Sequence, residues 1–286
     1  MVDLRAIPYN LSDEDIAWVE STLASMTVEE KIGQLFCLTD MITDTEELKA
    51  LIGKYKPGGF MYRAGNGEEI QRAYHAMNEA STIPMLFPCN LESGGNGISP
   101  DGTFFGRPLQ VAATDDVEQA RRLGYICARE GTAVGCNWAY APIVDIDFNW
   151  RNPITNVRTF GSDPKRVLAM AEGYMDGVAQ VETPMAVCIK HFPGDGPAEN
   201  GFEPHLPIGQ WRLYPTEGSM EKYHLPPFQA AFDMKASAIM PDYSRICNDG
   251  RSVPQYYKGK LTSSEAVPSA YSKELLQDLA RDTMGF

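Results

Sequence analysis

"MAVCIKHFPGDG", residues 185–196, is an apolar run that stops at Lys190 and His191 and then turns into a loop rich in glycine and proline. A short, continuously apolar run bounded by turn residues is typical of a strand that is buried on both faces of a parallel sheet. Charged residues at the end of such a strand lie toward the loops rather than in the core. The stretch therefore predicts a parallel α/β fold with a polar site at the carboxyl end of this strand.

The same order of apolar run, polar turn and amphipathic helix recurs along the chain. Helix starts are marked by Ser12, which precedes acidic residues, and by Thr27, which has Glu30 three positions later. We predict strands over residues 32–38, 59–62, 83–89, 137–146, 185–191 and 236–240, and helices over residues 116–131, 163–179 and 226–234. Apolar strands that alternate with helices indicate a parallel sheet covered by helices.

Two architectures fit this alternation, a doubly wound sheet and a barrel. No G-x-G-x-x-G motif follows the first strand, which weakens the dinucleotide-binding version of the doubly wound sheet. Polar residues follow several different strands: Asn90, Glu92, Asp145, Asp147, Lys190, His191, Asp242 and Tyr243. Because a barrel brings all its strand ends to one mouth, we predict the fold class α/β, a parallel (β/α) barrel of the TIM type.

This barrel is expected to be incomplete. A closed barrel of this type has eight strands, and the sequence provides about six of the eight βα units. We therefore expect residues 1–286 to form a single barrel domain that lacks its C-terminal strands. The open wall leaves room for a homo-oligomer or for a partner that completes the barrel.

The net charge and the cysteine content exclude several classes of function. The 25 basic and 38 acidic residues give a net charge of -13, which repels phosphate backbones and anionic lipid. No nucleic acid and no membrane partner is expected. The N-terminus has no apolar signal-peptide run, and the six cysteines contain no C-x-x-C pair. We expect a cytoplasmic protein with reduced cysteines, without a metal or another cofactor.

Four segments, in this order, resemble one enzyme family. They are MTVEEKIGQLF (26–36), APIVDIDFNWRNPITNVRTFGSDP (141–164), KHFPGDG (190–196), and IMPDYS (239–244) followed by SKELLQDLARDTMGF (272–286). Together they are similar to the N-terminal domain of family 3 glycoside hydrolases, a family that includes β-glucosidases and β-N-acetylhexosaminidases. The resemblance runs over almost the full length of the chain.

The resemblance implies an enzyme with a carbohydrate substrate, which hydrolyses terminal non-reducing β-linked glucosides or N-acetylhexosaminides by a retaining mechanism. It places Arg158, Lys190 and His191 at positions that bind the terminal sugar. Charged donors and acceptors of this kind suit the hydroxyl groups of a pyranose ring. From the residues alone, Arg158 could instead be a structural partner of Asp145 or Asp163.

The strand-three position departs from the family pattern. Where the family usually has an aspartate, this chain has Asn90, an amide that keeps an acceptor but loses the charge, and Glu92 could substitute for it. The resemblance also makes Asp242 and Tyr243 substrate-binding candidates, with Asp242 beside a tyrosine that contacts substrate.

The loop after Lys190 and His191 is the candidate source of the acid/base. In the hexosaminidase branch this loop carries an Asp-x-His pair whose histidine transfers the proton, and Glu203 and His205 stand here at a similar distance. A carboxylate beside an imidazole raises its basicity and fixes its tautomer. Asp195 stands where that branch often has a histidine, so the match is imperfect.

The family nucleophile is an aspartate on the strand that would follow Phe286. We therefore expect the chain alone to bind a sugar but not to form the glycosyl-enzyme intermediate. Two other functions stay open: a non-catalytic sugar-binding or partner-completed half-barrel, and an aldolase that forms a Schiff base at Lys190.

Some residues near these sites have a plainer interpretation. Asp145 and Asp147 are expected to be mainly structural, holding loop backbone and nearby arginines. Trp138, Trp150 and Trp211 could stack on a sugar, but aromatic residues this close to strands are more often core residues.

Overall fold

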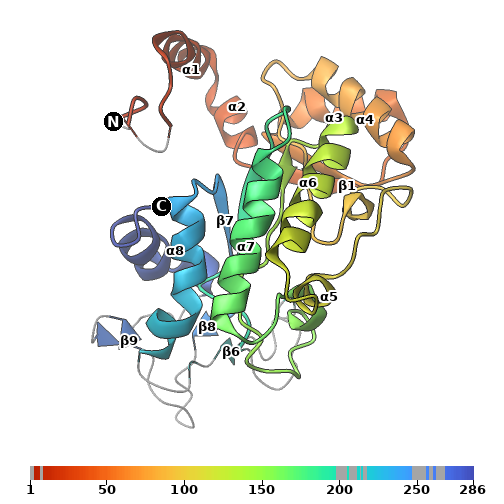
Figure 1. Cartoon of the computed structure of the whole chain (residues 1–286). Helices are drawn as coiled ribbons and strands as arrows, with labels where there is room; N and C mark the ends of the chain where they lie inside the picture. The colour runs from red at the N-terminus through yellow and green to blue at the C-terminus, as the bar shows by residue number, and fades with distance from the viewer. Residues whose placement is uncertain are drawn as a thin grey trace. The chain divides into compact units, whose positions relative to one another are not determined.

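The computed structural model describes residues 3–6, 9–197, 205, 211–212, 214, 218–246, 256–257, 260–261 and 268–286 (Figure 1). Contacts between Cα atoms divide the chain into two compact units, Met1–Pro88 and Cys89–Phe286. Each unit has its own buried apolar side chains, and the two are described in turn.

The first unit contains a pair of parallel strands and four helices. They are α1 (Asp13–Ser25), α2 (Val28–Gly33), β1 (Cys37–Asp40), α3 (Thr45–Tyr55), β2 (Gly59–Tyr62) and α4 (Gly67–Ala80). Strand β2 pairs with β1, and Gly59 also bridges in parallel to Leu86. Leu48, Ile52 and Phe60 are completely buried, and α3 packs against α4.

The predicted strand over residues 32–38 is wrong in its first part, because helix α2 extends through Gly33. Thr27 and Glu30 form the predicted capping box: the Glu30 amide donates to Thr27 Oγ1 at 3.2 Å, and the Thr27 amide donates to Glu30 Oε2 at 2.8 Å. These bonds satisfy the free amides at the helix start, so the apolar residues that follow continue the helix. The strand begins only at Cys37.

The second unit contains the longest helices. Its main elements are β3 (Pro88–Cys89, which starts at the last residue of the first unit), α5 (Pro108–Ala112), α6 (Val117–Ala133), β4 (Trp138–Ala139), α7 (Pro164–Ala179), β5 (Ala186–Phe192), α8 (Leu225–Asp233) and β7 (Ala238–Pro241). Shorter elements are η1 (Gly95–Gly97), η2 (Asn156–Arg158), η3 (Met220–His224), η5 (Ser269–Tyr271), η6 (Glu274–Arg281), β6 (Trp211–Arg212), β8 (Arg245–Ile246), β9 (Tyr256–Tyr257) and β10 (Lys260–Leu261). No helix in the described ranges combines the length and the apolar character needed to cross a membrane.

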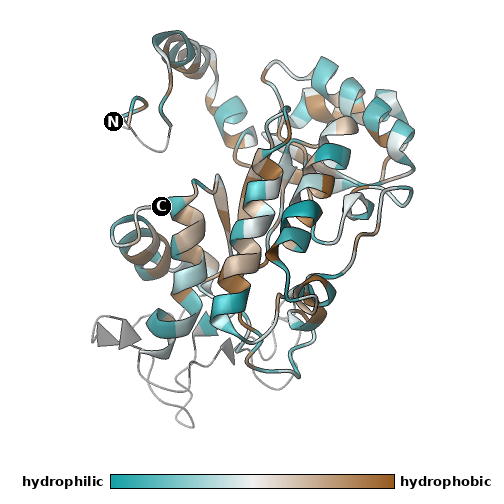
Figure 2. Ribbon diagram, in the orientation of Figure 1, coloured by the Kyte–Doolittle hydropathy of each residue, from teal (hydrophilic) through white to brown (hydrophobic). Residues whose placement is uncertain are grey.

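A four-stranded sheet forms the centre of the second unit, in the order β3-β4-β5-β7. Strand β5 runs parallel to β4 and to β7, and the residues opposite Cys188 and Lys190 on β7 are Ala238 and Met240. Helix α7 packs between α6 and α8 (Figure 1), and its mixture of polar and apolar residues is visible in Figure 2. Parallel strands covered by helices confirm the predicted α/β fold class.

The six predicted strands are present as β1, β2, β3, β4, β5 and β7, although several are shorter than predicted. Within the described residues they form a two-stranded and a four-stranded sheet, so the barrel is not closed. The predicted helices at 116–131, 163–179 and 226–234 correspond to α6, α7 and α8. The parallel strand ends of the second unit are where the polar residues gather.

Candidate functional site

Lys190 lies at the carboxyl end of β5 and is only 1% exposed. Its ammonium Nζ donates to Oδ1 of Asn90 at 3.1 Å and lies 2.6 Å from Oε1 of Glu92. Asn90 and Glu92 follow directly after β3, about one hundred residues earlier in the chain. The ends of two strands therefore meet around one buried cation, as the barrel-mouth hypothesis predicts.

Arg158 reaches the same carboxylate from the loop after β4. Its Nε donates to Glu92 Oε2 at 2.9 Å and one terminal nitrogen donates to Glu92 Oε1 at 2.8 Å, while the other donates to the carbonyl of Ile154 at 3.0 Å. This bidentate arrangement fixes both the guanidinium and the carboxylate. Arg158 is therefore hydrogen-bonded to Glu92 and not to Asp145 or Asp163, the two alternative partners that the sequence offered, although Asp145 still attracts it electrostatically.

The charges of this cluster are set by burial and by mutual attraction. Burial alone would raise the pKa of Glu92. The attraction of Lys190 and Arg158 outweighs this effect and lowers the pKa to about 2. Burial lowers the pKa of Lys190, and Glu92 opposes that shift. For Arg158, burial lowers the pKa but Glu92 outweighs it, and the net direction is upward. At neutral pH the carboxylate is ionised and holds two cations in place.

His191 is held by a buried carboxylate. Its Nδ1 lies 2.8 Å from Oδ2 of Asp145, and its backbone amide donates to both oxygens of that carboxylate at 3.2 Å. The Asp145 carboxylate also accepts the backbone amide of Asp195 at 2.6 Å. Burial would raise the pKa of Asp145, but these hydrogen bonds lower it overall. The contact at Nδ1 leaves Nε2 as the ring nitrogen available to a ligand.

Asp145 is the residue whose role the sequence reasoning underestimated. It does hold loop backbone as expected, but it also orients His191, which was not predicted. The two aspartates of V-D-I-D at residues 144–147 are the available signal, but the pattern does not show which of them turns inward. Asp145 is fully buried, whereas Asp147 is half-buried and its carboxylate is contacted by Thr155 Oγ1, at 3.5 Å, and by the backbone of Asn156.

Two further predicted residues lie at the end of the neighbouring strand β7. Asp242 is buried, its amide donates to the carbonyl of Phe192 at 3.0 Å, and its carboxylate accepts the amide of Ser244. Tyr243 is 53% exposed, and its ring centroid lies 5.2 Å from that of His205. The structure thus brings Asn90, Glu92, Arg158 and Lys190 together, and separately brings His205 next to Tyr243. Glu203 lies outside the described residues.

Trp138 and Trp150 are less buried than the core residues they were predicted to be. Trp138 is half-buried and its ring packs edge-on against Tyr140, with centroids 5.1 Å apart. Trp150 is 72% exposed, so the prediction that it is a core residue is wrong. The side chain of Trp211 lies outside the described part of the chain.

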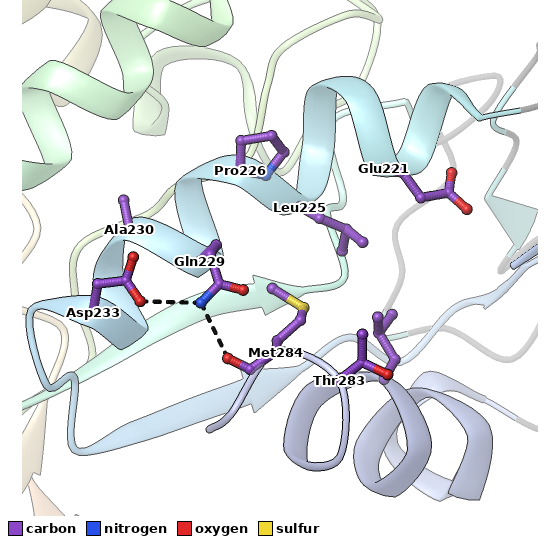
Figure 3. A pocket seen from close by; sticks show the side chains of 9 residues that line it. Glu221, Leu225, Pro226, Gln229, Ala230, Asp233, Thr283 and Met284 are labelled. Atoms are coloured by element: carbon purple, nitrogen blue, oxygen red, sulfur yellow. Dashed lines mark hydrogen bonds between the residues drawn. The ribbon is translucent and has the colours of Figure 1, made fainter. Parts of the chain in front are cut away.

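A groove of about 540 Å³ lies elsewhere in the second unit, between α8 and the C-terminal helical turns (Figure 3). Leu225, Ala230 and Leu279 line its apolar part, and Gln229 Nε2 donates at its edge to Asp233 Oδ1 at 3.1 Å and to the Met284 carbonyl at 3.0 Å. None of the Lys190 cluster lines this groove. Within the described ranges, no group of three or more His, Cys, Asp or Glu side chains is arranged to hold a metal ion.

The fold and the cluster define a TIM-type α/β barrel protein with a buried, charged cluster at its strand ends. Residues 27–286 match the glycosyl hydrolase family 3 N terminal domain. The chain belongs to this family.

Individual relatives agree with the assignment. The chain is 35% identical to the β-N-acetylglucosaminidase/β-glucosidase of Cellulomonas fimi, over 100% of this chain and 49% of that protein. It is 30% identical to β-glucosidase C of Emericella nidulans, over 94% of this chain and 44% of that protein. The solved structure of the β-glucoside phosphorylase BglX bound to 2FGlc superposes with a TM-score of 0.86 and 38% identity, covering 99% of this chain and 49% of that one. The chain spans about half the length of these relatives.

Proposed function

We propose that the whole protein hydrolyses terminal non-reducing β-linked sugars, a β-glucoside or a β-N-acetylhexosaminide, with retention, and that these residues act as one barrel domain supplying the sugar-binding part of the site. The observation that carries the proposal is the buried carboxylate of Glu92, held by both Lys190 and Arg158. Such a cluster offers several charged donors and acceptors within a small space, as the hydroxyl groups of a pyranose require.

Each residue of the cluster has a proposed task. The Lys190 ammonium donates to one sugar hydroxyl, and Nε2 of His191 bonds to a neighbouring hydroxyl because Asp145 holds Nδ1. Glu92 accepts a hydrogen bond from a sugar hydroxyl, and it substitutes for the aspartate that the family usually has at the position of Asn90. Asn90 itself supplies an amide beside it. Hydrogen bonds of this kind, when they strengthen at the transition state, lower the barrier to glycosidic cleavage.

The acid/base is proposed to be His205, with Glu203 as its carboxylate partner. Tyr243, whose ring lies beside that of His205, would contact the sugar and the imidazole together. Asp242 is proposed as a positioning carboxylate at the site, not as the nucleophile, because it is buried and accepts the amide of Ser244 within its own turn.

Phosphorolysis is a second candidate, since the solved relative with a TM-score of 0.86 is a β-glucoside phosphorylase. In that reaction inorganic phosphate takes the place of water as the acceptor. An imidazole acid/base fits this chemistry, because a neutral ring does not repel an incoming phosphate as an ionised carboxylate would.

The test is to supply the full-length protein with 4-nitrophenyl β-glucoside and its N-acetylglucosaminide, with and without inorganic phosphate. Free sugar as the product supports hydrolysis, and a sugar 1-phosphate that forms only with phosphate supports phosphorolysis. Lys190→Met should abolish turnover, while Lys54→Met on helix α3 should leave it unchanged. Binding of the sugar without any turnover would establish the non-catalytic alternative, and a borohydride-trapped adduct on Lys190 would establish the aldolase.

We also infer that the protein works in the cytoplasm. Cys127, Cys136 and Cys188 are buried and form no disulfide, and burial raises the pKa of Cys127 and of Cys188 to about 12. Such thiols pack as small apolar groups. Recovery of the native protein from a periplasmic or secreted fraction of its own cells would contradict the inference.

A further inference from the structure

Trp150 presents a large aromatic surface to solvent, since it is 72% exposed. The guanidinium of Arg151 lies over the ring, 5.0 Å from its centroid. This contact uses one face of the indole and leaves the rest of the ring uncovered. An exposed indole offers a face on which another flat ring can stack.

The loop that carries Trp150 is held by its own hydrogen bonds. The side-chain amide of Asn156 donates to the Trp150 carbonyl at 3.0 Å, and the Arg151 amide donates to Asn149 Oδ1 at 3.2 Å. The amide of Asn152 donates to the Asn149 carbonyl at 2.8 Å. The ring is therefore presented by an ordered turn, which reduces the entropy lost when a ligand binds.

The same loop is bonded to the candidate site. Buried Asn152 donates its side-chain amide to the Asp195 carbonyl at 2.8 Å, and the Asn149 amide donates to the Gly196 carbonyl at 3.2 Å. The amide of Asp195 in turn donates to Asp145, the carboxylate that orients His191. The loop begins after Asp145, which holds His191, and ends at Arg158, which is bonded to Glu92. Both of its ends therefore lie at the candidate site.

We propose that Trp150 binds the leaving group of the substrate, either a second sugar ring or an aryl aglycone. The ring stacks on the indole face that Arg151 does not cover, and the guanidinium on the other face holds the indole in place. This inference rests on the proposed function, because a leaving group exists only if the cluster around Lys190 holds the terminal sugar.

Trp150→Ala in the full-length protein tests the proposal with three substrates: cellobiose, 4-nitrophenyl β-glucoside and β-glucosyl fluoride. Fluoride has no ring to stack. We expect kcat/KM to fall about tenfold for the first two substrates, and to stay within about twofold for the fluoride. Trp150→Phe should retain part of the activity. Arg151→Ala removes only the contact on the other face of the indole and should cost less than Trp150→Ala with both ring-bearing substrates.

The matched control is Trp18→Ala, which removes another exposed tryptophan, 52% exposed on α1. It should leave all three rates unchanged. An equal loss for the fluoride in Trp150→Ala, or no loss for cellobiose, would overturn the proposal. If the unaltered protein turns over no glycoside, the proposed function fails. The inference is then tested by binding affinity: cellobiose should bind more tightly than glucose, and Trp150→Ala should remove that difference. Equal affinities in the unaltered protein would refute it.

Discussion

The Nζ atom of Lys190 lies 2.6 Å from Oε1 of Glu92, and both side chains are almost completely buried. The guanidinium of Arg158 bonds to the same carboxylate, so one anion compensates two cations away from bulk water. Charged groups that lose their hydration cost several kcal/mol each unless they are paired. Glu92 is therefore the residue on which the electrostatics of the cluster depend.

Replacing Glu92 by glutamine should destabilise the fold strongly. The substitution keeps the shape of the side chain but leaves Lys190 and Arg158 without their counter-charge, which typically costs about 3–5 kcal/mol for a buried pair. The free energy of unfolding, measured by urea denaturation, reports the loss. As a control, Glu118→Gln removes a partner of Arg121 in a much more exposed pair on α6 and should cost less than about 1 kcal/mol. Equal losses for the two variants would contradict the assigned role of Glu92.

The same carboxylate should make stability depend on pH in the acid range. The pKa of Glu92 is about 2 in the folded protein against an ordinary value of 4.5, so the unfolded state takes up the proton first as the pH falls. The stabilisation is complete above pH 4.5 and is lost progressively toward pH 2, by about 3 kcal/mol. The measurement is the difference in unfolding free energy between the unaltered protein and Glu92→Gln, followed from pH 5.5 downward. A difference that does not shrink as the pH falls would show that Glu92 is not the titrating group.

Much of this arrangement is visible in the sequence because the βα rhythm fixes where strands end. A polar residue directly after an apolar run lies at the barrel mouth, and this rule places Asn90, Glu92, Lys190 and His191 without coordinates. The rule states that such residues converge. It does not state which of them form pairs.

Pairing depends on side-chain direction and on loop paths, and these are decided by packing between distant segments. Closeness in sequence offers Asp145 or Asp163 as alternative partners of Arg158, and the structure pairs it with Glu92, 66 residues away. The wrong strand start at residues 32–38 has a different cause. There the capping box of Thr27 commits the chain to a helix, and an apolar run alone does not distinguish a helix end from a strand.

Asp145→Asn should weaken sugar binding by about tenfold or more. The amide replaces an ionised acceptor that takes the Nδ1 contact of His191 and the backbone amides of His191 and Asp195, so the imidazole loses its fixed orientation. Calorimetric titration with glucose or N-acetylglucosamine measures the effect. Asp147→Asn is the matched control two residues on. It should change the affinity little, because Asp147 is half-buried and its carboxylate contacts Thr155 and Asn156 within its own loop. If both variants bind equally well, Asp145 does not orient the site.

Gly194 should tolerate no side chain, because it shapes the turn that directs the Asp195 amide at Asp145. Its φ angle is +132°, and a Cβ atom there would lie 3.0 Å from Cβ and 3.1 Å from Nδ1 of buried His224. The Tyr214 hydroxyl also donates to the Gly194 carbonyl at 2.9 Å, so the backbone has little freedom to move away. Backbone strain and overpacking together should make Gly194→Ala cost about 3 kcal/mol of unfolding free energy.

The control for Gly194→Ala is Gly218→Ala. Gly218 also has a positive φ angle, +76°, but no atom of the described residues lies within 4 Å of its added Cβ. It should cost about 1 kcal/mol, from backbone strain alone. The difference between the two variants isolates the contribution of the packed turn. Gly194→Ala should additionally weaken sugar binding in the same direction as Asp145→Asn, because both changes disturb the bond between the Asp195 amide and the Asp145 carboxylate. A Gly194→Ala variant as stable as Gly218→Ala would mean that His224 and Tyr214 do not constrain the turn.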